Sequence, residues 1–226
     1  MLEKVKMSSE LIVMLTHNDL TVENAYEVFD ACRETPARYW GFKEQPLPLA
    51  EMQRIYAYMK ACGKRTVLEV VAYTEAEGLA GAQMAADCGC DILMGTCYHP
   101  SILRFCQEHG IAYMPFIGQI EGRPSVLRGS VESMVTEATK LAASGAYGID
   151  LLGYRYDGDA EELIREIVAE TSHPVCVAGS IDSYERLDFV KTVRPWAFTI
   201  GSAFFDHRFG DTIADQITRV CEYMED

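Results

Sequence analysis

Eight short apolar runs alternate with eight longer segments along this chain, and this alternation restricts the fold more than any other feature. The short runs are rich in β-branched and aromatic residues, which favour strands, and the longer segments have the apolar periodicity of helices. Strands that alternate with helices indicate parallel strands joined by crossover helices. The expected strands are 11–15, 39–43, 66–71, 92–96, 112–117, 148–152, 175–178 and 196–200, and the expected helices are 22–33, 49–62, 76–88, 100–108, 131–144, 160–171, 184–193 and 212–224.

Eight strand–helix units favour closure into a single (β/α)8 (TIM) barrel over an open Rossmann-like or flavodoxin-like sheet, which usually contains fewer units. The 226 residues suit one barrel, so we expect one domain over residues 1–226. Glycines directly after several expected helices fit left-handed helix caps. Thr21, Ser130 and Asp159 are expected to cap the beginnings of three helices, because their side-chain oxygens can accept from free amides.

The chain is acidic, with 20 Lys and Arg residues against 34 Asp and Glu residues and a formal net charge of −14. Such a surface repels phosphate backbones and anionic lipids, so we expect neither a nucleic acid nor a membrane as partner. The first apolar run, 11–15, is too short for a membrane span or a signal-peptide core, and we expect a cytoplasmic protein. Association into a homo-oligomer stays open, because no feature identifies an interface.

In a (β/α)8 barrel the functional residues lie at the carboxyl ends of the strands. Two neighbouring ends carry the same pair, Gly179-Ser180 after the seventh strand and Gly201-Ser202 after the eighth. Glycine allows close approach of the backbone to a ligand, and residues 202–205 are expected to form a short helix with free amides at its beginning. These features predict a site for a small phosphorylated ligand. The alternative is that both glycines only form tight strand-to-helix turns.

On Ala178-Gly179-Ser180 and Ile200-Gly201-Ser202-Ala203-Phe204, the chain resembles the phosphate-binding (β/α)8 barrels. This broad group contains the ribulose-phosphate-binding barrels and the indole and histidine biosynthesis barrels. The resemblance implies that phosphate binds in the loops after the seventh and eighth strands. The motif covers the last quarter of the chain and indicates a superfamily without selecting a member.

Three charged residues fall inside expected strands: Lys43 in the second, Glu69 in the third and Asp150 in the sixth. A charged side chain facing the helix layer would be buried without a partner, so all three should point into the barrel. Strand alternation then places Tyr39 and Val67 inside as well. We predict Lys43, Glu69 and Asp150 as catalytic residues near the mouth, with a buried structural Lys43–Glu69 ion pair as the alternative.

This set of residues fits a lyase of the aldolase type, or an isomerase or epimerase, acting on a phosphorylated carbonyl compound. A lysine with a lowered pKa forms a Schiff base with a carbonyl, and a nearby carboxylate moves protons. Class I aldolase barrels place that lysine on other strands. The aromatic-biosynthesis isomerase barrels pair a strand-one cysteine with a strand-six aspartate, a role that Asp150 matches while the first strand ends in Thr16 or His17.

His17 and Arg155 are further candidates for substrate binding, since both follow expected strands. Arg155 could clamp a carboxylate or second phosphate through two hydrogen bonds, or pair at the surface with Asp157 or Asp159. The glycine-containing loop 118–129 suits a mobile lid. No cofactor is expected, because the dinucleotide, P-loop and nucleophile-elbow motifs are absent from the sequence.

Three other functions remain as alternatives. A non-catalytic barrel could sense a phosphometabolite, as regulatory antiterminator-like barrels do. A metal-dependent hydrolase could use His17 with acidic residues, although no two histidines have the i, i+4 spacing of one helical face and we expect no metal. Chains with this appearance are also labelled 4-hydroxythreonine-4-phosphate dehydrogenase, but the histidine metal cluster of that family is not evident here.

Overall fold

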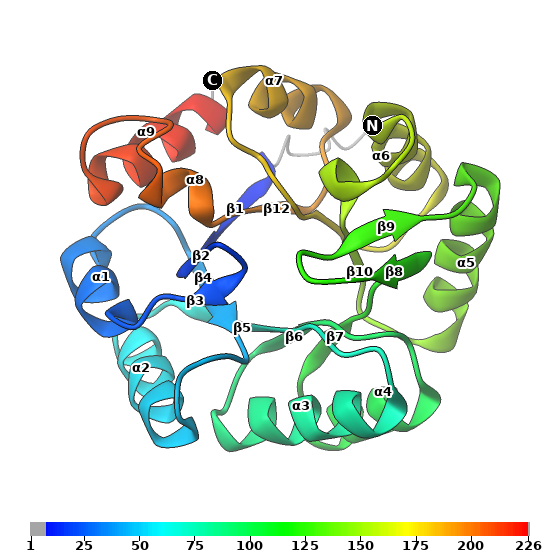
Figure 1. Ribbon diagram of the computed structural model, residues 1–226, viewed down its shortest axis with the longest axis horizontal. Helices are drawn as coiled ribbons and strands as arrows, with labels where there is room; N and C mark the ends of the chain where they lie inside the picture. Colours follow the sequence, from blue (N-terminus) through cyan, green and yellow to red (C-terminus); the bar gives the residue numbers. More distant parts are fainter. Residues whose placement is uncertain (1–7, 226) are drawn as a thin grey trace, which may run out of the picture.

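The computed structural model describes residues 8–225, in which eight parallel strands form a barrel surrounded by helices (Figure 1). The strands are hydrogen-bonded in the order β10-β11-β12-β1-β4-β5-β6-β7. A parallel bridge between Phe116 and Asp150 joins the two ends of this order, so the (β/α)8 prediction is confirmed. The barrel strands are β1 (Glu10–Met14), β4 (Tyr39–Lys43), β5 (Arg65–Val70), β6 (Ile92–Gly95), β7 (Ala112–Met114), β10 (Ile149–Leu151), β11 (Val175–Val177) and β12 (Ala197–Ile200).

Each barrel strand is followed by a helix, and the helix bounds agree with the expected ones to within a few residues. Ser130 and Asp159 cap α5 and α6 as predicted, since their side chains accept from the amides of Ser133 and Glu162. Within residues 8–225 no helix is long and apolar enough to cross a membrane. The helices are α1 (Ala25–Cys32), α2 (Leu49–Ala61), α3 (Glu75–Asp87), α4 (Pro100–Glu108), α5 (Val131–Ser144), α6 (Ala160–Glu170), α7 (Tyr184–Val193), α8 (Ser202–Phe205) and α9 (Ile213–Glu225), with a 3-10 turn, η1 (Gly153–Arg155), before α6.

The predicted helix cap at Thr21 is wrong, because a small hairpin stands between β1 and α1. Strands β2 (Thr16–His17) and β3 (Leu20–Thr21) form this hairpin, and α1 begins only after Asn24. The Thr21 hydroxyl bonds to the backbone of Lys43 instead, donating to its carbonyl at 2.8 Å and accepting from its amide at 2.9 Å. Thr21 therefore fixes the hairpin to the end of β4, where a candidate catalytic residue lies.

A second hairpin, β8 (Gln119–Glu121) and β9 (Val126–Arg128), occupies the loop 118–129 and extends over part of the barrel mouth (Figure 1). Tyr73 donates a hydrogen bond to the carbonyl of Gly122 at 2.7 Å, and Arg123 pairs with Glu44. The loop expected to be a lid is thus a hairpin held to the far side of the mouth. Its motion stays a prediction.

Apolar side chains fill the barrel interior beneath the mouth. Val67 belongs to this interior group and Tyr39 packs against it, as strand alternation predicted. Gly41 lies between β1 and β5, and a Cβ atom there would lie 2.2 Å from the carbonyl oxygen of Val67. This close packing confines polar chemistry to the mouth. The buried members of the group are Ile12, Met14, Val67, Ile92, Met94, Met114, Cys176 and Ala197.

Candidate active site

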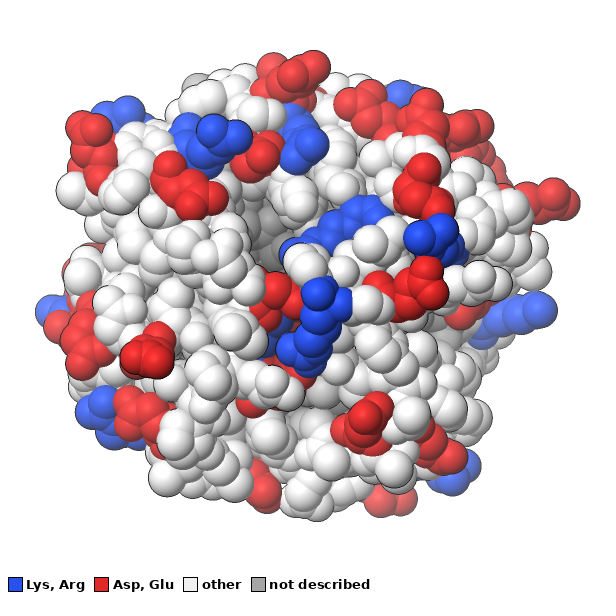
Figure 2. Space-filling model, viewed as in Figure 1, with Lys and Arg blue, Asp and Glu red and all other residues white. Residues whose placement is uncertain are grey.

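A cavity of about 520 Å³ opens at the carboxyl ends of the strands. Figure 2 shows this face hollowed near its centre, with both basic and acidic side chains at the edge of the hollow. Four of the predicted site residues, Gly179, Ser180, Gly201 and Ser202, line one end of the cavity, and three, Lys43, Glu69 and Arg155, line the other. The lining residues are Met14, Thr16, Asp19, Lys43, Glu69, Ser125, Leu152, Arg155, Ala178, Gly179, Ser180, Ile181, Asp182, Thr199, Gly201, Ser202, Ala203, Asp206 and Arg208.

Seven of the nine predicted site residues therefore line the cavity. His17 and Asp150 do not.

The loops 179–180 and 201–202, here called the Gly-Ser loops, form one end of the cavity. Gly179 and Ser180 have left-handed backbone conformations, with φ of 86° and 51°, and α8 begins at Ser202 as predicted. Within residues 8–225, the backbone N–H groups of four residues at this end donate no hydrogen bond: those of Ser180, Ile181, Ser202 and Ala203. Free amides at the beginning of a helix and in such turns are suited to an anion.

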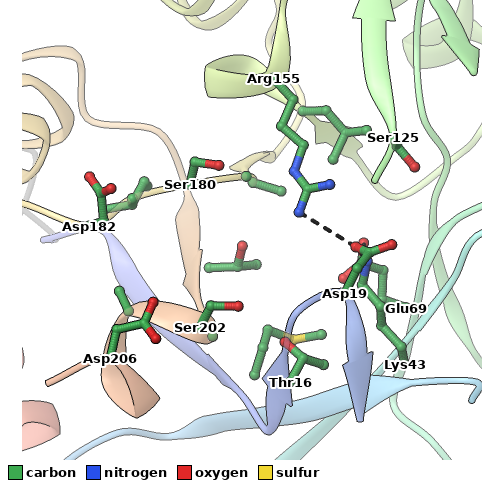
Figure 3. A pocket seen from close by; sticks show the side chains of 18 of the residues that line it. Thr16, Asp19, Lys43, Glu69, Ser125, Arg155, Ser180, Asp182, Ser202 and Asp206 are labelled. Atoms are coloured by element: carbon green, nitrogen blue, oxygen red, sulfur yellow. Dashed lines mark hydrogen bonds and ion pairs between the residues drawn. The ribbon is translucent and has the colours of Figure 1, made fainter. Parts of the chain in front are cut away.

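Four charged side chains form the other end, and they are called the charged cluster below (Figure 3). The Nζ atom of Lys43 lies 2.5 Å from Oδ1 of Asp19 and 3.4 Å from Oε1 of Glu69. Nη2 of Arg155 lies 3.5 Å from the same oxygen of Asp19. Lys43, Asp19 and Glu69 are almost fully buried, with side chains 8%, 8% and 9% exposed. Lys43 and Glu69 are in register across β4 and β5, which explains their contact.

The surroundings of Lys43 keep its amine protonated. Burial by itself lowers the pKa of Lys43, but Glu69 and Asp19 outweigh it, and the pKa is raised above its ordinary value. The lowered pKa expected for a Schiff-base lysine is therefore wrong for this arrangement. An ammonium group at this position is suited to stabilising negative charge on a ligand oxygen.

Asp150 lies in β10 with a fully buried side chain. Neither of its carboxyl oxygens has a hydrogen-bond partner among the described residues. Burial and the nearby Glu69 carboxylate raise the pKa of Asp150 well above its ordinary value, which favours the protonated form of the carboxyl group. Asp150 can reach a ligand only if its surroundings move, and its catalytic role stays a prediction.

Arg155 and His17 have different positions relative to the cavity. The Arg155 side chain passes over Gly179, where a Cβ atom would lie 2.8 Å from its Cγ, and reaches Asp19. The surface pairs considered for it are not formed, because Asp157 contacts Arg128 and Asp159 caps α6. His17 places Nε2 3.0 Å from Oδ1 of Asp206, a lining residue, and its role in substrate binding stays a prediction.

Asp19 is the main site residue that the sequence analysis missed. It occupies the turn of the β2–β3 hairpin, where Asn18 and Asp19 have φ of 50° and 68°. Asn and Asp tolerate these angles, and such pairs are typical of two-residue hairpin turns. The letters Asn-Asp between Thr16-His17 and Leu20-Thr21 were the available signal.

No metal-binding group of three or more His, Cys, Asp or Glu side chains is found in residues 8–225. The expectation that the protein uses no metal and no cofactor stays a prediction, which elemental analysis of the purified protein would test.

No protein-family model and no curated protein matches the chain. Solved structures do match it, and three of them are covered over nearly their whole length. The tryptophan synthase alpha chain of Legionella pneumophila has 12% identity and a TM-score of 0.68, covering 96% of this chain and 92% of that one. A structure described as native KDPGal has 14% identity and a TM-score of 0.67, covering 100% and 98%. N-(5'-phosphoribosyl)anthranilate isomerase of Pyrococcus furiosus has 13% identity and a TM-score of 0.65, covering 95% and 98%.

These similarities show that the chain has the (β/α)8 barrel fold. At this identity they carry no statement about its reaction. One of these neighbours is named as the alpha chain of an enzyme. Whether this chain forms a homo-oligomer stays a prediction.

Proposed function

We propose that this protein is an isomerase or epimerase that moves a proton in a small phosphorylated carbonyl compound. One observation carries the proposal: a single cavity joins the Gly-Ser loops to the charged cluster. A ligand whose phosphate is held by the Gly-Ser loops would place its carbonyl group next to the charged cluster.

The residues divide the work by position. The amides of the Gly-Ser loops would hold the phosphate, which needs no lysine and is possible despite the net charge of −14. The Lys43 ammonium would stabilise the charge that develops on the carbonyl oxygen when the neighbouring carbon loses its proton. A carboxylate of the cluster would accept that proton and return it to the adjacent carbon or the opposite face.

An aldolase-type lyase is the second candidate in the same class of substrate. Lys43 would have to lose its proton before attacking a carbonyl, and both Asp19 and Glu69 oppose that loss. Proton transfer with a charged Lys43 avoids this step, which is why we favour the isomerase.

A non-catalytic sensor would bind the same ligand as the enzyme but would not change it. A sensor needs only the Gly-Ser loops, whereas the buried charged cluster costs free energy and is explained better by catalysis. The hydrolase and the dehydrogenase alternatives both depend on a metal group, for which the described residues offer no cluster.

The test is solvent exchange. Wild-type protein would be incubated in D2O with phosphorylated aldoses and ketoses of three to six carbons, and proton NMR would follow the signal next to the carbonyl. We expect loss of that signal for at least one compound, and its retention with a folded Lys43→Met variant. Binding of the compounds without any exchange would contradict the proposal and favour the sensor.

A further inference from the structure

The two carboxyl oxygens of Asp19 have different surroundings. Oδ1 forms ion pairs with both Lys43 and Arg155, whereas Oδ2 is buried and has no hydrogen-bond partner within residues 8–225. Asp19 also lines the cavity (Figure 3). A buried carboxylate oxygen without a donor is unfavourable and rare in folded proteins. The vacant lone pairs of Oδ2 are therefore suited to a donor that a ligand brings, once a small movement of the Asp19 side chain turns this oxygen to the cavity.

The charged cluster is also neutral as a whole. Lys43 and Arg155 supply two positive charges, and Asp19 and Glu69 supply two negative ones. The cluster therefore has no net positive charge to balance a full carboxylate of the ligand. The remaining lining cation, Arg208, lies at the other end and contacts Asp182 at 3.7 Å.

We propose that the reacting end of the ligand is uncharged and donates a hydroxyl to Oδ2 of Asp19, so the ligand is a phosphorylated sugar and not a phosphorylated sugar acid. This inference rests on the proposed function, because it keeps the ligand's phosphate at the Gly-Ser loops. It also assigns Arg155 to holding Asp19 instead of clamping a ligand carboxylate. A carboxylate at this end would face Oδ2 without a counter-charge and would be repelled.

Matched ligands test the proposal on wild-type protein. Calorimetry would compare glucose 6-phosphate with 6-phosphogluconate, in which the aldehyde carbon is a carboxylate, and ribose 5-phosphate with 2-deoxyribose 5-phosphate. We expect the neutral sugar phosphate to bind at least about tenfold more tightly than its acid, since like charges at an interface are strongly disfavoured. The deoxy compound should bind more weakly than ribose 5-phosphate.

Two variants separate the charge at Asp19 from charge in general. Asp19→Asn leaves the cluster with one unmatched positive charge, so the preference should shift toward the sugar acid by about tenfold or more. Asp182→Asn removes a carboxylate at the phosphate end, where Asp182 lies 2.9 Å from Arg186. It should change the affinity for both compounds by a similar factor and keep their ratio.

Equal or tighter binding of the sugar acid to wild-type protein would overturn the inference and leave the phosphate site intact. An equal shift of the ratio in both variants would overturn it as well, because Asp19 would then have no special place. Absence of binding by every phosphorylated compound would overturn the proposed function itself. The wild-type comparisons decide the matter even if Asp19→Asn does not fold.

Discussion

The Nζ atom of Lys43 lies 2.5 Å from Oδ1 of Asp19, and this contact joins the end of β4 to the turn of the β2–β3 hairpin. The candidate site is therefore built from a barrel strand and from a short insertion that follows a different strand. The Thr21 hydroxyl, bonded to the backbone of Lys43, fixes the same two segments. Changes in the hairpin should consequently affect both stability and chemistry.

Replacement of Asp19 by alanine should destabilise the fold by about 1–3 kcal/mol, because Lys43 and Arg155 lose a buried partner while Glu69 still compensates Lys43. Urea unfolding measures this change. Asp157→Ala is the matched control, since it removes an exposed pair with Arg128 and should cost no more than about 1 kcal/mol. Equal losses in the two variants would contradict the account of a buried cluster.

Asp150→Asn should change the pH dependence of stability. The pKa of Asp150 is raised in the folded protein, so the folded state keeps a proton that the unfolded chain releases above about pH 4. Wild-type stability contributed by this group is therefore full at low pH and is lost as the pH rises. The variant lacks this loss, and its stability relative to wild type should increase between pH 5 and 8. Parallel curves of unfolding free energy against pH would show that Asp150 is not protonated.

Gly41→Ala should destabilise the barrel by about 2 kcal/mol or more, because the added Cβ would meet the backbone of Val67 at 2.2 Å. Strands β4 and β5 would have to separate just below Lys43 and Glu69. Gly63→Ala serves as the control: it has open space around it, and its φ of 76° should cost only about 1–2 kcal/mol. Thermal unfolding of both variants measures the difference, and a Gly41→Ala protein as stable as wild type would refute this packing.

The sequence predicted those parts of the structure that depend on local patterns. Periodicity located the eight strands and their helices, and the Gly-Ser pairs located one end of the cavity. The inward direction of Lys43 and Glu69 followed from the cost of burying an unpaired charge in the helix layer.

The missed features depend on contacts between distant segments. Strands of two residues, such as β2 and β3, have no periodicity to detect, so the hairpin that carries Asp19 was not predicted. The direction of the Lys43 pKa shift depends on two carboxylates that come from different parts of the chain. Arg155 contacts Asp19 and not Asp157, and this contact likewise depends on segments that only the folded barrel brings together.

The central claim is that the Gly-Ser loops bind phosphate, and substitution of Ser180 tests it most directly. Ser180 is exposed at the cavity and has φ of 51°, which both Asp and Asn tolerate. Ser180→Asp and the matched Ser180→Asn therefore differ mainly by one negative charge beside the free amides.

Calorimetry would compare binding of inorganic phosphate and of a phosphorylated sugar to wild type and both variants. We predict that Ser180→Asp weakens binding by about tenfold or more, whereas Ser180→Asn stays within about threefold of wild type. Equal affinity in the Asp and Asn variants, or no binding by wild type, would contradict the phosphate site and with it the proposed function.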